Sequence, residues 1–209
     1  NKEGTSVKQL TIALAKGRLM DETIELFNSK GIAIDYEENS RKLIFESKDK
    51  TLKFLIVRAQ DVATYVEGNG ADLGVCGLDV LTENKKDVFE LMDLNIGKCS
   101  LVVAGKTPNY PDTPTQLKVA TKFVNITDEF FAKKVMTIEI IKLYGSIELA
   151  GVIGLADCIV DIVSTGQTLK ENSLYVIEEI MKSSAFLIAN HVSYYTKNEE
   201  VTRLLELLK

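Results

Sequence analysis

The sequence offers little material for disulfide bonds or a zinc site. Its three cysteines, Cys76, Cys99 and Cys158, lie far apart in a chain of 209 residues. Disulfide frameworks and zinc sites need paired or closely spaced cysteines, so we expect each thiol to be a small buried hydrophobic group. Histidine occurs once, at His191. A lone histidine near tyrosines is more often packed at a surface than catalytic, and we assign it no role.

Long apolar runs and an excess of positive charge are absent as well. No apolar run approaches the roughly 20 residues that cross a bilayer, and the polar start, Asn1 to Gln9, lacks the apolar segment of a signal peptide. We therefore expect a cytoplasmic protein without membrane contact. The net charge of −5 and the sequence pI near 5.1 argue against a nucleic-acid partner, which would require a basic surface. Any anionic ligand must then meet a local cluster of basic residues.

Strand-like and helix-like segments alternate along the chain. Hydrophobic residues make up 45% of it, enough for a buried core. Residues Leu10–Ala15 form a strand-like run, and Met20–Lys30 has apolar residues at helical spacing. Further strands are predicted at 52–57, 73–76, 100–104, 118–121, 137–141, 157–162 and 184–189. The alternation predicts an α/β fold with a parallel or mixed sheet covered by helices. No internal repeat is visible.

One turn-rich segment predicts a boundary between two lobes. All three prolines of the chain fall within residues 106–114. We expect lobe I to comprise residues 1–95 and 184–209, because the last strand would return the chain to it, and lobe II to comprise residues 96–183. Two crossings between lobes would leave a cleft whose closure could bring two substrates together.

The segment with the clearest chemistry is DCIVDIVSTGQTLKENSL, which starts at Asp157. A buried-type strand is followed by a turn and then by a helix start. The turn consists of Ser164, Thr165, Gly166, Gln167 and Thr168. Its backbone N–H groups can curl around a phosphate, with Gly166 permitting a positive φ and the helix adding its positive end. The two threonines would donate hydroxyl hydrogen bonds to the same phosphate.

An ordinary helix N-cap is the alternative interpretation of this TGxT turn, because Ser or Thr before a helix is common. The acidic residue on the strand favours phosphate binding. Asp161 could accept hydrogen bonds from ribose hydroxyls while the turn holds a 5′-phosphate. Such a strand, acid, turn and helix resemble the phosphoribosyl-pyrophosphate loop of phosphoribosyltransferases.

Four stretches together resemble the ATP phosphoribosyltransferase family. They are LTIALAKGRLMDETIELF from Leu10, SRKLIF from Ser40, VRAQDVATYVEGNGADLGVCGLDVL from Val57 and KLYGSIELAGVIGLADCIVDIVSTGQTL from Lys142. They occur in the family's order and spacing and span most of the chain. The family usually has Pro or Ser where Ala15 stands, Lys where Leu78 stands and Pro where Gly151 stands.

The resemblance implies two α/β lobes similar to those of type II periplasmic binding proteins, with the substrate cleft between them and the phosphoribosyl-pyrophosphate loop in lobe II. The implied enzyme is a pentosyltransferase. It transfers the phosphoribosyl group of phosphoribosyl pyrophosphate to N1 of ATP and releases pyrophosphate, in the first step of histidine biosynthesis. Mg²⁺ would be bound mainly through the substrate, with unknown protein ligands. The length matches short-form members, so we expect at least a homodimer and a hetero-oligomer with a regulatory subunit resembling histidyl-tRNA synthetase.

The resemblance and the strand positions together assign several cations to phosphate oxygens. Lys16, Gly17 and Arg18 follow the first strand, where ligand sites of α/β folds lie, and Arg18 can present a planar fork to phosphate. We expect both arginines to be catalytic, with Arg18 contacting a triphosphate or pyrophosphate and Arg41 contacting the departing pyrophosphate. Arg58 follows another strand and is a further substrate-binding candidate. A solvated loop charge is the alternative for each of these cations.

Acidic residues complete the predicted site. Asp72 and Asp79 flank a stretch containing Gly77, where backbone could approach a nucleotide closely, and a helix cap is the alternative role for Asp79. Glu148 and Asp161 are expected to bind ribose hydroxyls and, through them or through water, magnesium. Glu148 could instead be a solvated helix charge.

Two other functions use the same features. A solute-binding protein would employ two lobes and a cleft for transport or sensing, although the missing signal peptide speaks against an exported version. A phosphoribosyltransferase with a different acceptor base is the second, because the phosphate turn recognises the sugar and says little about the base.

Overall fold

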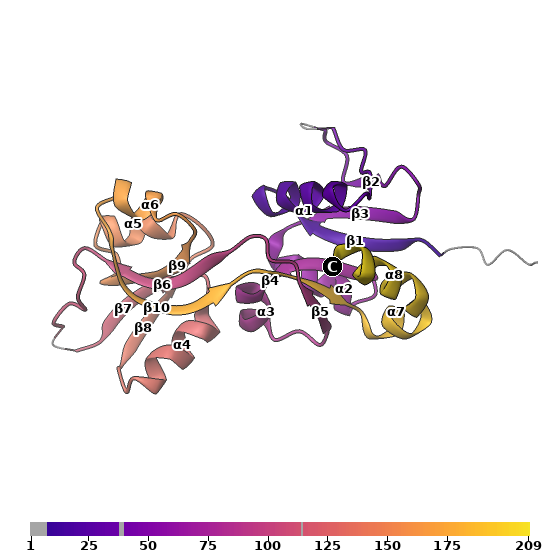
Figure 1. The fold of residues 1–209 in the computed structure, drawn as a ribbon. Helices are drawn as coiled ribbons and strands as arrows, with labels where there is room; N and C mark the ends of the chain where they lie inside the picture. Colours follow the sequence, from indigo (N-terminus) through magenta and orange to yellow (C-terminus); the bar gives the residue numbers. More distant parts are fainter. Residues whose placement is uncertain (1–7, 38–39, 114) are drawn as a thin grey trace, which may run out of the picture. The chain divides into compact units, whose positions relative to one another are not determined.

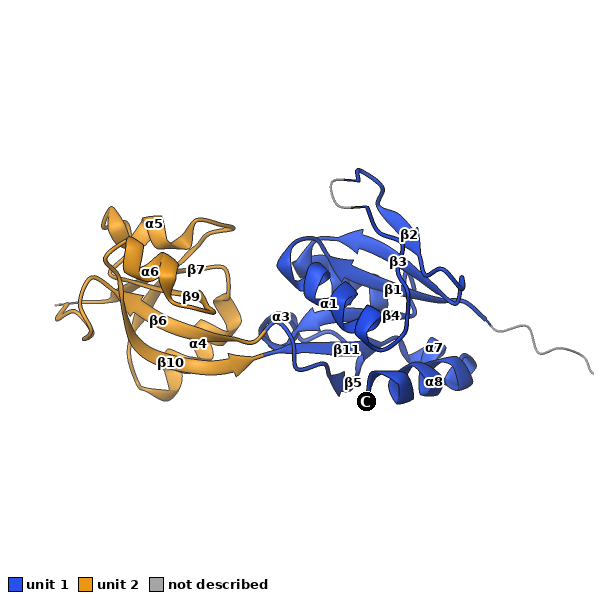
Figure 2. Cartoon of the chain, turned by 45° about the horizontal axis from the view of Figure 1, so that its top comes forward, with its two compact units in different colours: residues 1–97, 184–209 blue, residues 98–183 orange. Residues whose placement is uncertain are grey.

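The computed structural model describes residues 8–37, 40–113 and 115–209, so what was predicted from residues 1–7 or from Pro114 lies outside the described residues. The chain divides into two compact units. Unit 1 comprises residues 1–97 and 184–209, and unit 2 comprises residues 98–183 (Figure 2). Each unit contains one sheet with helices on both of its faces (Figure 1).

Unit 1 is built on a six-stranded mixed sheet with the order β2-β3-β1-β4-β11-β5. Its strands are β1 (Leu10–Ala15), β2 (Ile44–Glu46), β3 (Leu52–Val57), β4 (Leu73–Gly77), β5 (Phe89–Asp93) and β11 (Ala185–Ala189). Strands β3, β1 and β4 are parallel, whereas β2, β11 and β5 pair antiparallel with their neighbours. Because β11 lies between β4 and β5, this sheet is complete only after the chain has returned from unit 2.

Helices cover both faces of the unit 1 sheet. They are α1 (Arg18–Ser29), α2 (Val62–Glu67), α3 (Leu78–Asn84), α7 (His191–Thr196) and α8 (Asn198–Leu208), with a 3₁₀ turn at Ala59–Asp61. Helices α1 and α8 contribute to one core, α2 and α3 to the other. Val201, Leu204 and Leu208 of α8 are buried in the first core. These side chains therefore pack on their own unit.

Unit 2 has a five-stranded mixed sheet with the order β10-β6-β9-β7-β8. Its strands are β6 (Cys99–Gly105), β7 (Leu117–Thr121), β8 (Ile138–Lys142), β9 (Cys158–Val163) and β10 (Tyr175–Ser183), and its helices are α4 (Val124–Lys133), α5 (Ile147–Val152) and α6 (Gln167–Glu171). Strands β8, β7 and β9 are parallel, and β6 is antiparallel to both β9 and β10. Helix α4 packs on one face and α5 and α6 on the other.

The two units share one topology, a structural repeat that the sequence pattern did not reveal. Strands β3, β1, β4, β11 and β5 match β8, β7, β9, β6 and β10 in order and pairing direction. An aspartate occupies the same place in each unit. Asp72 N donates to Thr11 O at 2.9 Å and Asp72 Oδ2 accepts from Thr11 N at 2.8 Å. Asp157 and Lys118 repeat both bonds at the same two distances. Each aspartate fastens the amino end of a strand to its parallel neighbour.

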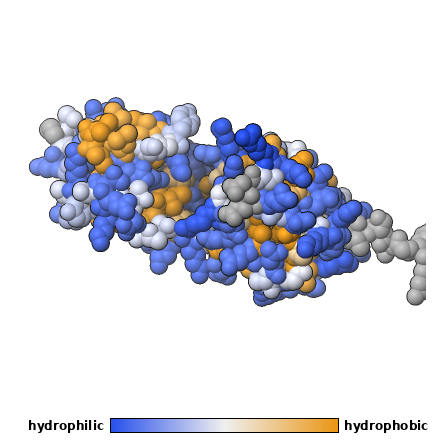
Figure 3. Space-filling model, turned by 90° about the horizontal axis from the view of Figure 1, so that it is seen from above, coloured by the Kyte–Doolittle hydropathy of each residue, from blue (hydrophilic) through white to orange (hydrophobic). Residues whose placement is uncertain are grey.

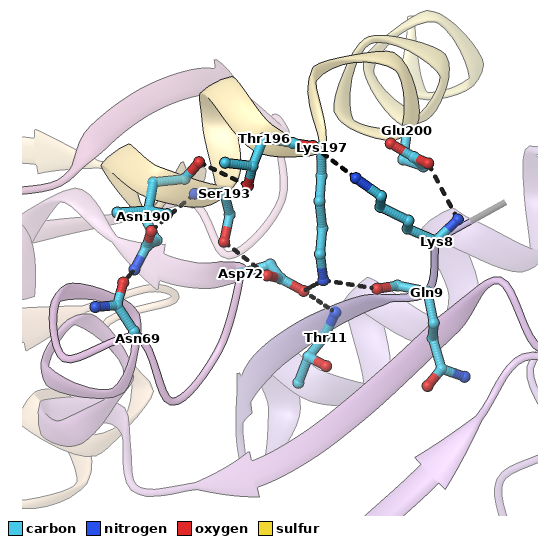
Figure 4. Close-up of polar contacts among 11 residues, drawn as sticks. Lys8, Gln9, Thr11, Asn69, Asp72, Asn190, Ser193, Thr196, Lys197 and Glu200 are labelled. Atoms are coloured by element: carbon cyan, nitrogen blue, oxygen red, sulfur yellow. Dashed lines mark hydrogen bonds and ion pairs between the residues drawn. The ribbon is translucent and has the colours of Figure 1, made fainter. Parts of the chain in front are cut away.

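Asp72 also anchors the C-terminal helices (Figure 4). Its Oδ1 accepts from Ser193 Oγ at 2.6 Å and its Oδ2 accepts from Lys197 Nζ at 2.9 Å. Asn190 caps α7 by accepting from Ser193 N at 2.9 Å. These contacts lie at the amino end of β4, so the structure gives Asp72 a role in holding unit 1 together.

Three strands, β2, β5 and β10, were not predicted from the sequence. All three lie at the edge of a sheet. Edge strands are partly solvated, so their apolar signal is weak. In β10, for example, the residues that follow Val176 include two consecutive glutamates. The inner strands were recognised because they are apolar runs buried on both faces.

One of the three cysteines differs from the expectation that each thiol is buried. Cys76 and Cys158 are buried, but Cys99 is half-buried, so its prediction as a buried group is wrong. None of the three, all within the described residues, forms a disulfide bond.

In the described part of the chain, every helix is too short or too polar to cross a membrane. Figure 3 shows a largely hydrophilic surface with apolar patches. On unit 2, Leu149 and Ile153 are 55% and 65% exposed.

Candidate substrate-binding site at the strand ends

In unit 1 the predicted cations gather at one edge of the sheet. The parallel strands β1, β3 and β4 end at this edge, and ligands of α/β sheets bind outside the carboxyl ends of such strands. Lys16 and Arg18 follow β1, and Arg58 follows β3. All three side chains are exposed. Positive charges that are separate in the sequence thus lie at one edge of the sheet. A chain with a net negative charge needs such a local group of cations to bind an anionic ligand.

Arg41 lies in a different segment, just before β2, whose backbone approaches this edge of the sheet. Ile56 N donates to Leu43 O at 2.8 Å, and β2 pairs antiparallel with β3 from Ile44 opposite Leu55. The backbone just before β2 therefore runs beside the end of β3. Arg41, which is exposed, lies two residues before Leu43 in this segment.

Gly17 lies at the start of α1 in a conformation that favours glycine. Its φ is +113°, a conformation that L side chains rarely adopt, and it is the N-cap of α1. Arg18 Nε lies 3.0 Å from Glu22 Oε1, and the arginine side chain is 58% exposed. An exposed pair of this kind contributes only about 0–1 kcal/mol. A phosphate oxygen can therefore compete with Glu22 for the guanidinium group.

Gly77 and Asp79 are packed against each other at the end of β4. Gly77 is the N-cap of α3, so Asp79, the second residue of that helix, is not its cap. A Cβ on residue 77 would overlap the Asp79 carboxylate. Only 4% of Asp79 is exposed, which leaves little of it for a ligand to reach. Burial, followed by the negative charge of Asp79, raises the pKa of the Cys76 thiol to about 12.

In unit 2 the predicted phosphate turn follows β9, whose carboxyl end lies beside those of β7 and β8. Gly166 has a φ of +77°, which confirms the predicted positive φ. A Cβ at this position would lie 3.8 Å from Val163 Cγ1, an ordinary contact. The need for glycine in the free protein therefore comes from the backbone conformation and not from crowding.

The cap interpretation of this turn has little support. The N-cap of α6 is Gly166, which has no side chain to accept a capping bond. Gln167 N donates to Thr165 Oγ1 at 3.3 Å, a long contact. The positive end of the helix nevertheless contributes less to anion binding than predicted. Helix α6 has only five residues, and a short helix sums few peptide dipoles. Anion binding would rest on the N–H groups of the turn and on the exposed Ser164, Thr165 and Thr168 hydroxyls.

Asp161 and Glu148 are both half-buried, and their charges interact. Burial raises the pKa of the Asp161 carboxyl, and the charge of Glu148 raises it further. A hydrogen bond from Ile162 N to Asp161 Oδ1, 2.9 Å long, and the charge of Lys122 lower it. Glu148 is the second residue of α5, and its partial burial speaks against a purely solvated helix charge.

Lys122 is the residue of this region that sequence reasoning missed. It directly follows β7, one strand away from β9. The signal was present, because a lysine immediately after a predicted parallel strand occupies a typical ligand position. Nothing in the sequence alone, however, placed that strand next to the one that carries Asp161.

His191 lies outside this arrangement. Its ring stacks on Phe89 with centroids 4.1 Å apart, and its Nε2 lies 3.2 Å from Asp87 Oδ1. Tyr194 also packs against Phe89, at 5.0 Å between centroids. The histidine is thus a packed surface residue, as expected.

In the described part of the chain, no metal cluster marks the predicted site, and of two cavities one touches it, at Gly166. Within the described residues, no three His, Cys, Asp or Glu side chains form a group that could hold a metal ion. A cavity of about 560 Å³ is lined by residues between Asp35 and Lys50 that include none of the predicted site residues. A second, of about 410 Å³, is lined by Gly166 together with Lys170, Tyr175 and others beside α6. The carboxyl ends of the parallel strands, rather than a closed cavity, define the candidate site.

Comparison with known proteins gives consistent results. The family model described as ATP phosphoribosyltransferase (HisG) matches residues 58–209. The ATP phosphoribosyltransferases of Caldanaerobacter subterraneus subsp. tengcongensis and Sulfurovum sp. are 50% identical over 202 residues and 49% identical over 201, and each match covers 96% of this chain and 96% of the relative.

Two solved structures resemble the chain. The ATP phosphoribosyl transferase (HisG:HisZ) complex from Thermotoga maritima gives a TM-score of 0.81 with 37% identity, covering 96% of both chains. The periplasmic aliphatic sulphonate binding protein SsuA from Escherichia coli gives 0.60 with 12% identity, covering 97% of this chain and 72% of that one, a likeness of fold alone. The predicted two-lobed α/β fold similar to periplasmic binding proteins is confirmed.

Proposed function

This chain belongs to the ATP phosphoribosyltransferase family, and we propose that it carries out the family's reaction with the strand-end residues of its two units. It is a pentosyltransferase that moves the phosphoribosyl group of phosphoribosyl pyrophosphate to N1 of ATP and releases pyrophosphate, the first step of histidine biosynthesis. One observation supports the assignment of the site: in each unit, predicted residues such as Lys16, Arg58 and Ser164 follow the carboxyl ends of the parallel strands.

Unit 2 is proposed to bind the phosphoribosyl group. The N–H groups of the turn at 164–168 would surround the 5′-phosphate, since a turn with a positive φ makes an anion-binding concavity. Asp161 and Glu148 would accept hydrogen bonds from the ribose hydroxyls. Such fixed carboxylates also suit the reaction, because the ribose gains positive charge as the bond to pyrophosphate breaks.

Unit 1 is proposed to bind the anionic oxygens of a triphosphate or pyrophosphate. Lys16, Arg18, Arg41 and Arg58 supply four positive charges on exposed side chains. Arginine binds phosphate with two parallel hydrogen bonds, which fixes the orientation of the group. Contacts from Arg18 and Arg41 that strengthen as pyrophosphate departs would lower the barrier of the reaction.

We propose that Mg²⁺ is bound mainly by the substrate and not by a group of protein ligands. The described residues contain no group of three acidic, histidine or cysteine side chains suited to a protein-bound metal. Mg²⁺ commonly keeps several waters and is held by phosphates with one or two carboxylates, an arrangement that Asp161 and Glu148 fit. The ion would neutralise charge on the pyrophosphate.

The assembly proposed is at least a homodimer that joins a separate regulatory subunit. Support comes from the Thermotoga maritima structure, which is a complex of HisG with HisZ. We propose that the regulatory subunit resembles histidyl-tRNA synthetase and confers inhibition by histidine. Location in the cytoplasm stays a prediction.

The activity is tested by mixing the purified chain, alone and with its regulatory subunit, with ATP, phosphoribosyl pyrophosphate and magnesium. We expect phosphoribosyl-ATP and pyrophosphate in equal amounts. Binding of phosphoribosyl pyrophosphate without turnover would favour a solute-binding protein. Turnover with another base but not with ATP would favour a different phosphoribosyltransferase.

The same assay tests the origin of feedback. Histidine is expected to inhibit only the reconstituted complex, because the sensing site is proposed to lie on the partner. Equal inhibition of the isolated chain and of the complex would refute this assignment. Analytical ultracentrifugation of the isolated chain tests the homodimer, and a monomer at assay concentration would contradict it.

A further inference from the structure

The carboxylate of Glu22 joins two groups of unit 1 that lie far apart in the sequence. Its Oε2 accepts from Gly97 N at 2.6 Å, and its Oε1 lies 3.0 Å from Arg18 Nε. Glu22 belongs to α1, one turn after Arg18, and its side chain is 32% exposed. Each carboxylate oxygen thus has its own donor, one from the backbone and one from the arginine that is proposed to contact phosphate.

The backbone that donates to Glu22 is itself fixed to the sheet. Ala185 N, at the start of β11, donates to Ile96 O at 2.9 Å, and Leu94 N donates to Ala185 O at 2.9 Å. Ala185 is buried. Residues 94–96 therefore continue the antiparallel pairing of β5 with β11, and the N–H group of Gly97, the next residue, has a defined position.

Helix α1 also packs against Gly97. A Cβ on residue 97 would lie 2.9 Å from Leu19 Cδ1, closer than real Cβ atoms approach. Leu19 and Glu22 are three residues apart, so they lie on the same side of the helix. The first turns of α1 therefore rest on this backbone, which holds the Glu22 carboxylate in place against the Gly97 N–H group.

We propose that Glu22 is a positioning residue, which directs the guanidinium group of Arg18 toward the phosphate oxygens of the substrate. The inference rests on the proposed function of unit 1. A guanidinium group is planar and binds phosphate through paired N–H groups, so its direction decides which oxygens it meets. An ion pair with a fixed carboxylate restricts that direction. Because an exposed pair is weak, it orients the arginine without withholding it from the substrate.

Only a carboxylate can serve both donors. Glutamate has two acceptor oxygens, whereas glutamine has one acceptor oxygen and an NH₂ group that only donates. In a Glu22→Gln variant, either Gly97 N or Arg18 Nε would therefore lose its acceptor. The two side chains have nearly the same volume, so this substitution removes the arrangement without opening a cavity.

The negative charge of Glu22 separates positioning from simple attraction. A carboxylate beside cations that bind phosphate opposes the binding of an anion, so its neutralisation should leave the KM for both substrates unchanged or lower. Loss of orientation should act on kcat instead, because the contact of Arg18 is proposed to strengthen as pyrophosphate leaves. A lower kcat without a higher KM therefore distinguishes positioning from a general loss of structure.

The test measures kcat and KM for ATP and for phosphoribosyl pyrophosphate, in the complex with the regulatory subunit. We expect Glu22→Gln to lower kcat about fivefold, which corresponds to the upper end of the contribution of an exposed ion pair, and to raise neither KM. Glu25→Gln is the matched control, because Glu25 is exposed, lies three residues further along α1 and loses the same charge. Its kcat and KM should equal those of the wild type.

A double variant tests whether Glu22 acts through the arginine. In an Arg18→Ala background, Glu22→Gln should lower kcat further by less than about twofold, because no guanidinium group is left to orient. Equal losses in the wild type and in the Arg18→Ala background would overturn the proposal. So would a Glu22→Gln enzyme with wild-type kcat, or one whose loss appears only as a higher KM.

Folding and the proposed function are checked in the same series. Circular dichroism reports the fold, and if Glu22→Gln does not fold, Glu22→Asp is measured against the same criteria, because its shorter side chain draws the carboxylate away from both donors. Failure of the proposed function is distinguishable: the wild-type complex would form no phosphoribosyl-ATP, or Arg18→Ala would keep its full kcat. Either result would also remove the positioning role.

Discussion

The substitution Gly166→Ala separates backbone strain from ligand binding. Gly166 has φ +77° and ψ 1°, in the left-handed region. An L residue there costs about 1–2 kcal/mol, whereas the added methyl group meets nothing closer than Val163 Cγ1 at 3.8 Å. The expected destabilisation therefore equals the backbone cost. For a chain of this size each kcal/mol lowers Tm by roughly 2–4 °C.

The effect on ligand binding follows from the same strain. If the alanine variant relaxes by leaving the left-handed conformation, phosphoribosyl pyrophosphate must restore that conformation before the N–H groups can surround the phosphate. A cost of about 1–2 kcal/mol weakens binding roughly 5- to 30-fold. Calorimetric titration with phosphoribosyl pyrophosphate measures this change. Gly166→Val should weaken binding further, because a β-branched side chain resists positive φ more strongly and crowds the phosphate.

Gly154 provides the control for this experiment. Its φ is +78°, and a Cβ there would lie 3.9 Å from its nearest neighbour, Lys106 Nζ. It precedes β9, at the end opposite Gly166. Gly154→Ala should lower Tm by a similar amount and leave the affinity for phosphoribosyl pyrophosphate unchanged. A folded Gly166→Ala protein with wild-type affinity would show that the turn does not bind the phosphate.

Two further predictions concern the fold. Lys197→Met removes the ammonium group that donates to Asp72 Oδ2 and Gln9 O; the free energy of unfolding should fall by about 1–3 kcal/mol, and an unchanged urea midpoint would contradict the anchoring role. Iodoacetamide at pH 8 should label Cys99 before Cys76 and Cys158. The pKa of each of the two buried thiols is raised to about 12, mainly by burial and further by the charge of an aspartate near it. Peptide mass spectrometry follows the order of labelling, and equal rates would refute this explanation.

Much of the inner architecture was predictable from local sequence. The run Leu10–Ala15 is strand β1 as predicted, and the positive φ of Gly166 follows from its place in the turn. Both depend on neighbouring residues only. Three of the four edge strands, β2, β5 and β10, were missed because half-exposed segments carry a mixed pattern that resembles loops, whereas the fourth, β8, was predicted.

Residue types at predicted strand ends also gave most of the candidate site. A basic residue or a hydroxyl-rich turn after a parallel strand identifies a ligand position without further information. The same reasoning did not foresee that Asp72 holds α7 and α8 or that Asp79 is buried. An aspartate two residues from a glycine looks the same in sequence whether it faces a ligand or the protein interior.

The sequence by itself determined the class of fold, the family and the position of the phosphate turn, because these depend on the order of local patterns along the chain. Only the tertiary structure decided which strand ends are neighbours. Strand β7, which Lys122 follows, lies beside β9, which carries Asp161, because the two strands pair in parallel with one particular register. The segment with Arg41 leads into β2, which lies beside β3 because these two strands pair antiparallel. Strand pairing is fixed by non-local hydrogen bonds and by burial of two faces at once. No local pattern contains that information.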